Sequence, residues 1–378
     1  MKKILVTGGA GFIGSHIVDL LLEEGKSEVF IFDNLDPQVH PDGEKPPYLN
    51  KDAVFIKGDV RDYDALKKAV REMEGIYHMA AAVGVGQSMY QIARYVQTNT
   101  LGTANLLDIL TNARNRVEKL LVAGSMSSYG EGRYKCALHG KVNPPLRPES
   151  QLEDGDWELY CPECGTVMVP LLTDENKPRD CNSIYALTKK DQEEMVLMWG
   201  KAYNIPTTAL RFFNVYGPRQ SLSNPYTGVC AIFLSRLLND KPPVVYEDGN
   251  QTRDFISVKD IARASLMAMN SDKADFQVFN VGAGGQISIK EIAQILAETL
   301  GKNIHPEIIN SYRKGDVRHC VADISRIKRT LGFETLVPLK TGMRELAEWT
   351  VSQRAEDGFE RASGELEKRG LVVKRQAE

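Results

Sequence analysis

Three glycines follow the first apolar run of the chain at a spacing that suits phosphate binding. The segment Thr7–Gly14 satisfies the G-x-G-x-x-G spacing through Gly9, Gly11 and Gly14, and a shifted spacing through Gly8, Gly11 and Gly14. Because glycine has no Cβ, the backbone can turn tightly and approach a pyrophosphate, and the N-terminus of the next helix offers free N–H groups. The segment lies between a predicted strand and a predicted helix, which is the context that gives this motif weight.

An acidic residue ends the second predicted strand. Asp33 can accept hydrogen bonds from an adenosine ribose and would repel a 2′-phosphate, which favours NAD over NADP. An ordinary strand-to-helix turn with a surface aspartate is the alternative. Asp59 and Val60 follow the third predicted strand and could flank the adenine, although a helix N-cap at Asp59 explains that residue equally well.

A tyrosine and a lysine one helical turn apart form a candidate proton-transfer pair. Tyr185 and Lys189 stand at i and i+4, on one face of a predicted helix. A tyrosine with a pKa near 10 is a poor base, but a neighbouring ammonium group favours the phenolate. Ser125 ends the fifth predicted strand, where doubly wound folds bind ligands. The pair alone would indicate an exposed helix face, but together with Ser125 and the glycine loop it favours a redox site acting on a hydroxyl group.

Two short Cys/His pairs form a candidate metal site. Cys136 and His139 are followed by Cys161 and Cys164, each pair with a two-residue gap and a glycine directly after it. Three thiolates and one imidazole suit a tetrahedral Zn²⁺, and with all four positions filled the site would be structural. In a reducing compartment this spacing favours a metal over a disulfide, with two reduced pairs in hairpin turns as the alternative.

Alternating apolar runs and amphipathic stretches predict the elements that position these groups. Short runs over 4–6, 29–32, 54–56, 76–79 and 120–122 read as strands, and the stretches 12–24, 64–72 and 183–203 read as helices. A further strand is expected over 207–215. This alternation predicts an α/β fold with a Rossmann-type doubly wound parallel sheet covered on both faces.

The chain divides into four predicted parts. Residues 1–130 and 182–215 form the NAD-binding Rossmann domain, and 131–181 form a Cys/His insert resembling a zinc ribbon. Residues 216–345 form a smaller mixed α/β substrate domain, some elements of which can return to the first domain. Residues 346–378 form a helical tail.

Composition narrows the possible partners. The 378 residues are 42% hydrophobic and 26% charged with a net charge of −3, which is ordinary for a globular protein and argues against a nucleic-acid partner. No apolar stretch is long enough to span a membrane, so we expect a cytoplasmic protein without a membrane partner.

The motifs jointly resemble a family. The pieces TGGAGFIG (7–14), FDN (32–34), GDVRD (58–62), HMAA (78–81), GSMSSYG (124–130), YALTK (185–189), RFFNVYGPR (211–219), RDFISVKDIA (253–262) and RKGD (313–316) resemble those of extended short-chain dehydrogenases/reductases acting on nucleotide sugars. The resemblance runs from about residue 2 to 345 and is interrupted by the insert. It implies Tyr185 as acid/base, Lys189 as the group that tunes the pKa of Tyr185 and binds the nicotinamide ribose, and Ser125 as hydroxyl partner.

The resemblance also implies the ligand contacts. A tightly bound NAD would contact Gly8, Gly11, Phe12, Ile13, Gly14, Asp33, Asn34, Asp59, Val60, Ala80, Asn99, Tyr185 and Lys189. A nucleotide-diphosphate sugar would contact Ser125, Ser127, Asn214, Val229, Tyr246, Arg253 and Arg313. Among these, Arg253 and Arg313 would clamp the diphosphate through charged hydrogen bonds. Tyr246 could stack on the base or pack in the core.

The resemblance further implies a homodimer formed by helices near 90–113 and 185–203. Apolar positions Leu106, Ile109, Leu110, Met195 and Met198 fit a dimer face and a monomer core equally well.

The residues after Ser125 narrow the expected reaction. Sugar 4,6-dehydratases of this family carry an Asp-Glu pair there, and the decarboxylases usually carry an acid, whereas this chain has Met126 and Ser127. The resemblance therefore implies a nucleotide-sugar 4-epimerase. Segments 83–103 and 218–240 look like those of dTDP-L-rhamnose 4-epimerases, with UDP-glucose and UDP-glucuronate 4-epimerases as near alternatives.

Two alternatives stay open. One is a dehydratase or decarboxylase of the same family. The other is a non-enzymatic NAD-sensing adaptor that grips a partner with the insert, although such a protein would not need Tyr185, Lys189 and Ser125 together.

Overall fold

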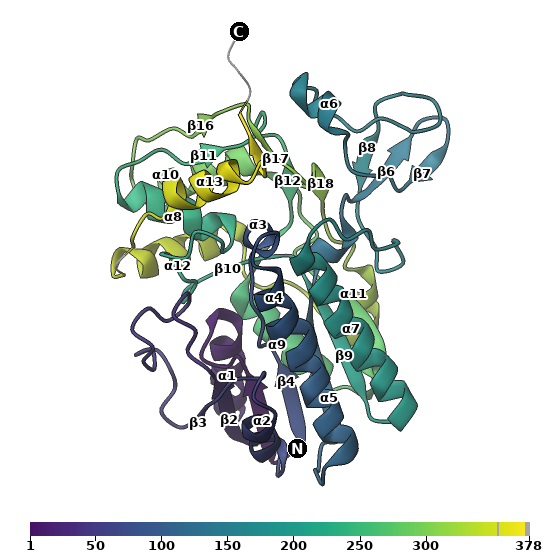
Figure 1. Cartoon of the computed structure of the whole chain (residues 1–378), viewed down its shortest axis with the longest axis vertical. Helices are drawn as coiled ribbons and strands as arrows, with labels where there is room; N and C mark the ends of the chain where they lie inside the picture. Colours follow the sequence, from purple (N-terminus) through teal and green to yellow (C-terminus); the bar gives the residue numbers. More distant parts are fainter. Residues whose placement is uncertain (354, 375–378) are drawn as a thin grey trace.

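A seven-stranded parallel sheet forms the centre of the computed structural model, which describes residues 1–353 and 355–374 (Figure 1). The strand order is β3-β2-β1-β4-β5-β9-β14, so the order reverses between β1 and β4. Doubly wound sheets bind ligands at the carboxyl ends of the strands beside this point. The strands are β1 (Lys3–Thr7), β2 (Glu28–Asp33), β3 (Val54–Lys57), β4 (Gly75–His78), β5 (Lys119–Ser125), β9 (Thr207–Phe212) and β14 (Gln277–Val281).

Side chains along the central strands alternate between two hydrophobic cores, one on each face of the sheet. In β1, Ile4 and Val6 enter one hydrophobic core, while Leu5 enters the other. In β5, Leu121 joins the first core and Leu120 the second. Successive side chains of a strand point to opposite faces, so a continuously apolar strand requires a helical layer on each side.

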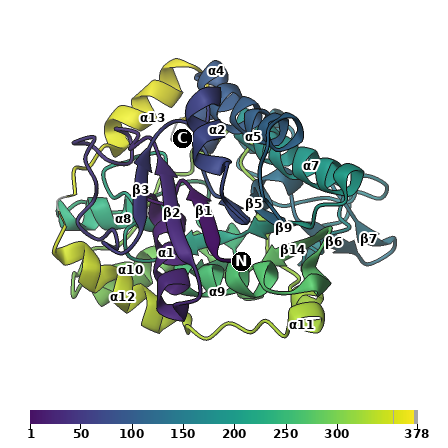
Figure 2. The ribbon, with the colours of Figure 1, turned by 90° about the horizontal axis from the view of Figure 1, so that it is seen from below.

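Helices form these two layers (Figure 2). One face carries α1 (Phe12–Glu24), α9 (Val258–Met269) and α11 (Ser325–Leu331), and the other carries α2 (Tyr63–Val70), α5 (Gly102–Asn112) and α7 (Ile184–Tyr203). The side chain of Ser183 caps α7 by accepting a hydrogen bond from the backbone N–H of Ala186 at 3.1 Å. This cap fixes the first turn of α7, which carries Tyr185.

The strand expected over 207–215 is wrong in one respect, because it is two strands. β9 ends at Phe212, and β10 (Asn214–Tyr216) leaves the sheet to pair with β13 (Phe255–Ser257). The backbone N–H of Phe213 still donates to Val281 at 3.1 Å, whereas that of Asn214 donates to Asp254 at 2.9 Å. The change of partner takes the chain out of the central sheet.

The smaller lobe lies above the carboxyl ends of the sheet (Figure 1). A separate hydrophobic core joins its helices α8 (Val229–Leu238), α10 (Ile289–Thr299) and α12 (Leu339–Val351). Three elements from the range 216–345, α9, α11 and β14, belong to the Rossmann sheet and its helical layer instead. Short strand pairs complete the lobe: β11 (Val244–Val245) with β16 (Glu307–Ile308), and β12 (Thr252–Arg253) with β15 (Ile287–Ser288) and β18 (His319–Cys320).

The C-terminal segment folds back onto this lobe. After α13 (Phe359–Lys368), β19 (Val372–Val373) pairs antiparallel with β17 (Tyr312–Arg313). The predicted tail is therefore helical only in part, and residues 354 and 375–378 of that prediction lie outside the described residues.

The insert is a small antiparallel sheet that projects beside the lobe (Figure 1). It comprises β6 (Arg133–Cys136), β7 (Gly140–Val142), α6 (Glu149–Glu153) and β8 (Val169–Leu171). The remaining helical segments are α3 (Val85–Ser88), α4 (Ile92–Tyr95), a π-helical turn (Val96–Leu101) and 3₁₀ turns (Met126–Tyr129, Asp272–Ala274). Among the described helices, none has both the length and the apolar character required to cross a bilayer.

Candidate active site

A cavity of about 380 Å³ opens at the carboxyl ends of β1, β2, β4 and β5. The glycine loop, the segment 212–215 and the start of α8 form its walls, with the first turns of α7 beside them. The structure brings most of the predicted ligand-binding residues to this cavity: Gly8, Gly11, Phe12, Ile13, Gly14, Asp33, Asn34, Val60, Ala80, Ser125, Tyr185, Lys189, Asn214 and Val229.

The glycine loop leaves room for a dinucleotide. A Cβ on Gly8, whose φ is +69°, would lie 2.8 Å from the backbone N of Ala80, and a Cβ on Gly14 would overlap the carbonyl oxygen of Gly8. Helix α1 begins after Gly11 without a side-chain cap and without an acidic residue in its first turn. The N-terminus of a 13-residue helix therefore faces the cavity with N–H groups that can bind a pyrophosphate.

The carboxylate of Asp33 ties the glycine loop to the end of β2. Its Oδ2 accepts a hydrogen bond from the backbone N–H of Ala10 at 3.0 Å, and its Oδ1 accepts one from Leu35 at 2.9 Å. Asp33 is 8% exposed and lines the cavity. A carboxylate has about four acceptor positions, so two remain for ribose hydroxyls. The residues present thus fit NAD.

Two predicted NAD contacts lie behind the cavity wall. Asp59 pairs with Arg61 at 2.6 Å and accepts a hydrogen bond from the amide of Asn34 at 2.9 Å. Burial alone would raise the pKa of Asp59, but these hydrogen bonds outweigh it and lower the pKa to about 2. Asn99 accepts a hydrogen bond from the backbone N–H of Ala82 at 2.7 Å and so positions a wall residue.

Tyr185 and Ser125 meet across the cavity floor. Tyr185 stands in the first turn of α7, where its backbone N–H donates to Ser88 Oγ at 3.0 Å. Burial raises the pKa of the Tyr185 phenol, and a hydrogen bond with Ser125 opposes this rise. Ser125 Oγ also accepts hydrogen bonds from the hydroxyl of Ser127 at 2.9 Å and from its backbone N–H at 3.2 Å. The pair can hold and release a proton at one substrate oxygen.

Lys189 lines the same cavity but is only 4% exposed. Its Nζ donates to Gln192 Oε1 at 2.8 Å, and the amide of Gln192 donates to Thr103 at 2.8 Å. Burial lowers the pKa of Lys189 to about 7, against a smaller opposing effect of Glu193.

Asn214 has a buried polar atom with no partner. Among the described residues, nothing bonds to its side-chain Oδ1, although native structures pair most such atoms. Asn214 lines the cavity, so a bound ligand can satisfy this group.

Three predicted substrate residues form a second cluster outside the cavity lining. Arg253 contacts Asp316 Oδ1 at 3.3 Å, and Arg313 contacts Asp316 Oδ2 at 2.7 Å. The guanidinium of Arg313 lies over the ring of Tyr246, with 4.9 Å between its carbon and the ring centroid. Arg313 keeps 46% of its side chain exposed and can reach a ligand. The guanidinium of Arg253 donates hydrogen bonds to the backbone carbonyls of Val317 and Arg318. Its role in ligand binding therefore stays a prediction.

The sequence analysis missed several residues that line the cavity. The loop after β2 crosses the cavity and is held by an ion pair between Asp36 and Arg94 at 2.9 Å. Gln38 on this loop donates to Asn224 at 3.1 Å. Gln220 lines the cavity with an unpartnered Oε1 among the described residues. These partners are far apart in the sequence, so no local spacing indicates them, although Gln220 directly follows the motif RFFNVYGPR.

Comparison with known proteins adds independent evidence. The chain is 38% identical to dTDP-L-rhamnose 4-epimerase of Burkholderia thailandensis over 356 residues, which cover 93% of this chain and 96% of that protein. Residues 4–151 match the model of the NAD dependent epimerase/dehydratase family. The chain belongs to this epimerase/dehydratase family. The expected membership in the nucleotide-sugar short-chain dehydrogenase/reductase group is therefore confirmed.

A second family model matches the C-terminal half of the chain, and solved structures match nearly its whole length. Residues 165–346 match the model described as GDP-mannose 4,6 dehydratase. The fold is similar to UDP-glucose 4-epimerase of Thermotoga maritima with UDP-glucose, with a TM-score of 0.74, 30% identity and coverage of 92% and 98% of the two chains. It is also similar to UDP-glucuronic acid 4-epimerase of Bacillus cereus with UDP-glucuronic acid and NAD, with a TM-score of 0.75, 27% identity and coverage of 92% and 99%.

Proposed function

We propose that this chain is an NAD-dependent nucleotide-sugar 4-epimerase. The main support is that Tyr185 and Ser125 line the same cavity as the glycine loop and Asp33. The two residues after Ser125, Met126 and Ser127, offer no carboxylic acid for chemistry beyond that pair. The 4-epimerase relatives support this reaction.

Gly8, Gly11 and Gly14 would hold the pyrophosphate of NAD, and Asp33 would hold its adenosine ribose. Bound there, the cofactor would supply reversible hydride transfer at C4 of the sugar, and return of the hydride to the opposite face would invert that carbon. Because the cofactor ends each cycle in its starting state, tight retention of NAD serves this reaction.

Tyr185 moves the proton that accompanies hydride transfer. Its phenolate removes the proton of the C4 hydroxyl, and Ser125 holds the same oxygen by hydrogen bonding. Lys189, one helical turn further along α7, would when protonated stabilise the phenolate. After the 4-keto sugar turns in the cavity, the Tyr185 phenol returns the proton to the oxygen and completes the inversion.

Arg253, Arg313 and Tyr246 form the nucleotide end of the proposed site. Two guanidinium groups that share Asp316 can exchange this carboxylate for a diphosphate, which offers more acceptor oxygens. Asn214 and Val229 line the same cavity as Tyr185. We favour a dTDP-hexose because the B. thailandensis relative acts on a dTDP sugar, with UDP-hexoses as the alternative.

A dehydratase is the second candidate, since residues 165–346 match a 4,6-dehydratase model. Loss of water after C4 oxidation requires an acid and a base at C5 and C6 in addition to Tyr185. Met126 cannot transfer a proton, and Ser127 uses its hydroxyl on Ser125. The local chemistry therefore favours epimerisation.

We also propose a homodimer, on a corrected set of residues. Leu106, Ile109 and Leu110 pack inside the monomer core, so they cannot form its interface. Met195 also packs against that core, but Met198 is 64% exposed. Exposed apolar side chains extend the face of Met198 onto neighbouring helical segments: Ile92, Val96, Leu101 and Leu187.

A substrate panel without added NAD tests the reaction. The purified protein is mixed separately with dTDP-L-rhamnose, UDP-glucose, UDP-glucuronate and UDP-N-acetylglucosamine, and the products are resolved by NMR. We expect one substrate to yield a 4-epimer of equal mass and Tyr185→Phe to abolish this conversion. Substantial turnover by Tyr185→Phe, or a 4-keto-6-deoxy or pentose product, would contradict the proposal.

A further inference from the structure

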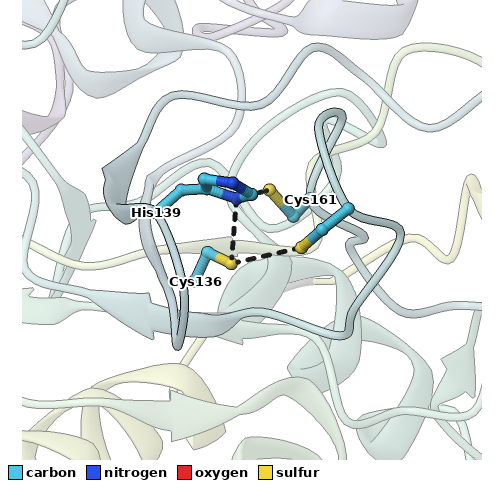
Figure 3. A group of neighbouring side chains, drawn as sticks. Cys136, His139 and Cys161 are labelled. Atoms are coloured by element: carbon cyan, nitrogen blue, oxygen red, sulfur yellow. Dashed lines mark hydrogen bonds between the residues drawn. The ribbon is translucent and has the colours of Figure 1, made fainter.

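The insert gathers four metal-ligand atoms at one point. Cys136 Sγ lies 3.6 Å from His139 Nδ1 and 3.5 Å from Cys164 Sγ, and His139 Nδ1 lies 3.3 Å from Cys161 Sγ. All four ligand atoms lie within 4.8 Å of one another. Figure 3 shows the thiols of Cys136 and Cys161 both turned towards the imidazole of His139.

The three separations of 3.3 to 3.6 Å lie close to the edges of a zinc tetrahedron. With Zn–S bonds of about 2.3 Å and Zn–N bonds of about 2.0 Å, tetrahedral geometry places ligand atoms roughly 3.5–3.8 Å apart. A disulfide requires sulfur atoms about 2.05 Å apart, and all three cysteines are free thiols. The arrangement therefore fits a shared metal ion and does not fit a covalent bridge.

The surroundings of the cluster support negatively charged sulfur ligands. Thr166 Oγ1 lies 3.1 Å from Cys164 Sγ and 3.5 Å from Cys136 Sγ, and the backbone N–H of Leu138 donates to Cys136 Sγ at 3.4 Å. On the far side of the imidazole, His139 Nε2 lies 3.5 Å from a carboxylate oxygen of Glu163. A carboxylate on the second ring nitrogen is the usual partner of a metal-bound histidine, because it fixes the tautomer that ligates.

The two turns that carry the ligands have the backbone this geometry requires. Gly140 and Gly165 directly follow the second ligand of each pair, and their φ angles are +71° and +70°. These left-handed conformations strain other residue types. Each glycine reverses the chain so that two ligands from one turn face the same point.

The part of the insert around the ligands has only a small hydrophobic core. Its own hydrophobic core contains five buried residues, of which Cys136 and Cys161 are two, besides Tyr134, Leu159 and Met168. A core this small contributes little to ordering the turns that carry the ligands, and small units of this kind usually gain stability from a metal or a disulfide.

We propose that Cys136, His139, Cys161 and Cys164 bind one structural Zn²⁺ that holds the insert in its fold. All four positions of the tetrahedron are filled by protein, so the ion has no open position for substrate. The ion lies outside the lining of the catalytic cavity and takes no part in hydride or proton transfer.

The zinc-bound insert also positions the diphosphate site, an extension that rests on the proposed function. Arg147 reaches out of the insert and donates to both carboxylate oxygens of Glu247, at 2.8 and 3.0 Å. The same guanidinium donates to the backbone carbonyl of Asp316 at 3.2 Å. Asp316 in turn holds Arg253 and Arg313, so one hydrogen-bonded chain joins the insert to both arginines.

Metal analysis of the full chain tests the zinc site directly. Protein purified without added metal is measured for zinc by mass spectrometry, and protein grown with cobalt is measured by visible absorption. We expect about one zinc per chain and the absorption of a tetrahedral thiolate–Co²⁺ site. Cys161→Ser should lose both signals, and Cys181→Ser, whose thiol lies outside the cluster, should keep them. Metal-free wild-type protein with all four ligands unmodified and the insert folded would overturn the site.

Nucleotide binding tests the positioning role separately from the activity. Arg147→Lys keeps the charge beside Glu247 but cannot span Glu247 and Asp316 together. We expect unchanged zinc content, a roughly 10-fold weaker Kd for dTDP or UDP by calorimetry, and unchanged NAD content. Unchanged nucleotide affinity in the variant would overturn the positioning role. Wild-type protein that binds NAD but neither nucleotide would instead contradict the proposed function and leave the zinc result standing.

Discussion

The hydroxyl of Ser127 donates a hydrogen bond to Oγ of Ser125 across 2.9 Å. Ser127 lies in the turn directly after β5 and orients the hydroxyl of Ser125, which lines the cavity together with Tyr185. This turn is therefore where the proposed proton chemistry can be tested.

Removing the Ser127 hydroxyl should slow catalysis modestly. In Ser127→Ala, Ser125 keeps the backbone N–H of residue 127 as a donor but loses the hydroxyl, at a cost of about 1 kcal/mol, or roughly a 5-fold fall in kcat. KM should change little. Steady-state kinetics of Ser127→Ala and Ser125→Ala, measured side by side, should show the larger loss of activity in Ser125→Ala. A larger loss in Ser127→Ala would contradict this prediction.

A methyl group at Gly14 should expel the cofactor. The added Cβ would overlap the carbonyl oxygen of Gly8, so the loop must shift from the geometry proposed to hold the pyrophosphate. We expect Gly14→Ala to retain on the order of 10-fold less NAD after purification, measured from cofactor released on denaturation. Gly285→Ala is the matched control, because a Cβ there meets open space and its φ is not left-handed. Full NAD retention by Gly14→Ala would refute this role of the glycine loop.

The lowered pKa of the buried Lys189 should make the free energy of unfolding depend on pH. Burial lowers the pKa of Lys189 from 10.5 to about 7, so between these values the unfolded chain binds the extra proton. The unfolding free energy of the NAD-free protein therefore rises with pH across this window. Lys189→Met removes this contribution, so the stability of wild type relative to the variant should increase from about pH 7 towards pH 10. Urea unfolding of both proteins at several pH values measures this difference in stability. A difference that does not change with pH would contradict the lowered pKa of Lys189.

Arg313 should contribute to substrate binding more than to stability. Arg313→Ala removes an exposed guanidinium that pairs with Asp316, and we expect KM to rise on the order of 10-fold with little change in kcat or melting temperature. Arg116→Ala is the control, because Arg116 is 62% exposed and pairs with Glu72 on another part of the surface. An unchanged KM in Arg313→Ala would remove Arg313 from the site.

Local patterns predicted the elements that such patterns determine. The helix expected over 12–24 is α1 with the same bounds, and the parallel order of the sheet follows from strands and helices in alternation. The glycine loop, Asp33, Ser125 and Tyr185 were found because their spacing along the chain carries their chemistry.

Features that depend on distant segments were not predictable in this way. The pairing of Asp36 with Arg94 and the link from Arg147 to Glu247 join residues with no fixed spacing. The break of the expected strand 207–215 depends on Asp254, which draws Asn214 away from the sheet. The sequence leaves Leu106, Ile109 and Leu110 open between a monomer core and a dimer interface, since apolar periodicity does not tell what covers a helix face, and the structure places them in the core.

Isotope tracing at C4 tests the central claim most directly. A nucleotide sugar with deuterium at C4 is converted by the NAD-containing protein in ordinary water, and NMR and mass spectrometry locate the label. The proposed chemistry predicts a 4-epimer that retains deuterium at C4, because the hydride leaves and returns without exchange. A 4-epimer that has lost its deuterium to solvent, or a product lacking water or carbon dioxide, would contradict it.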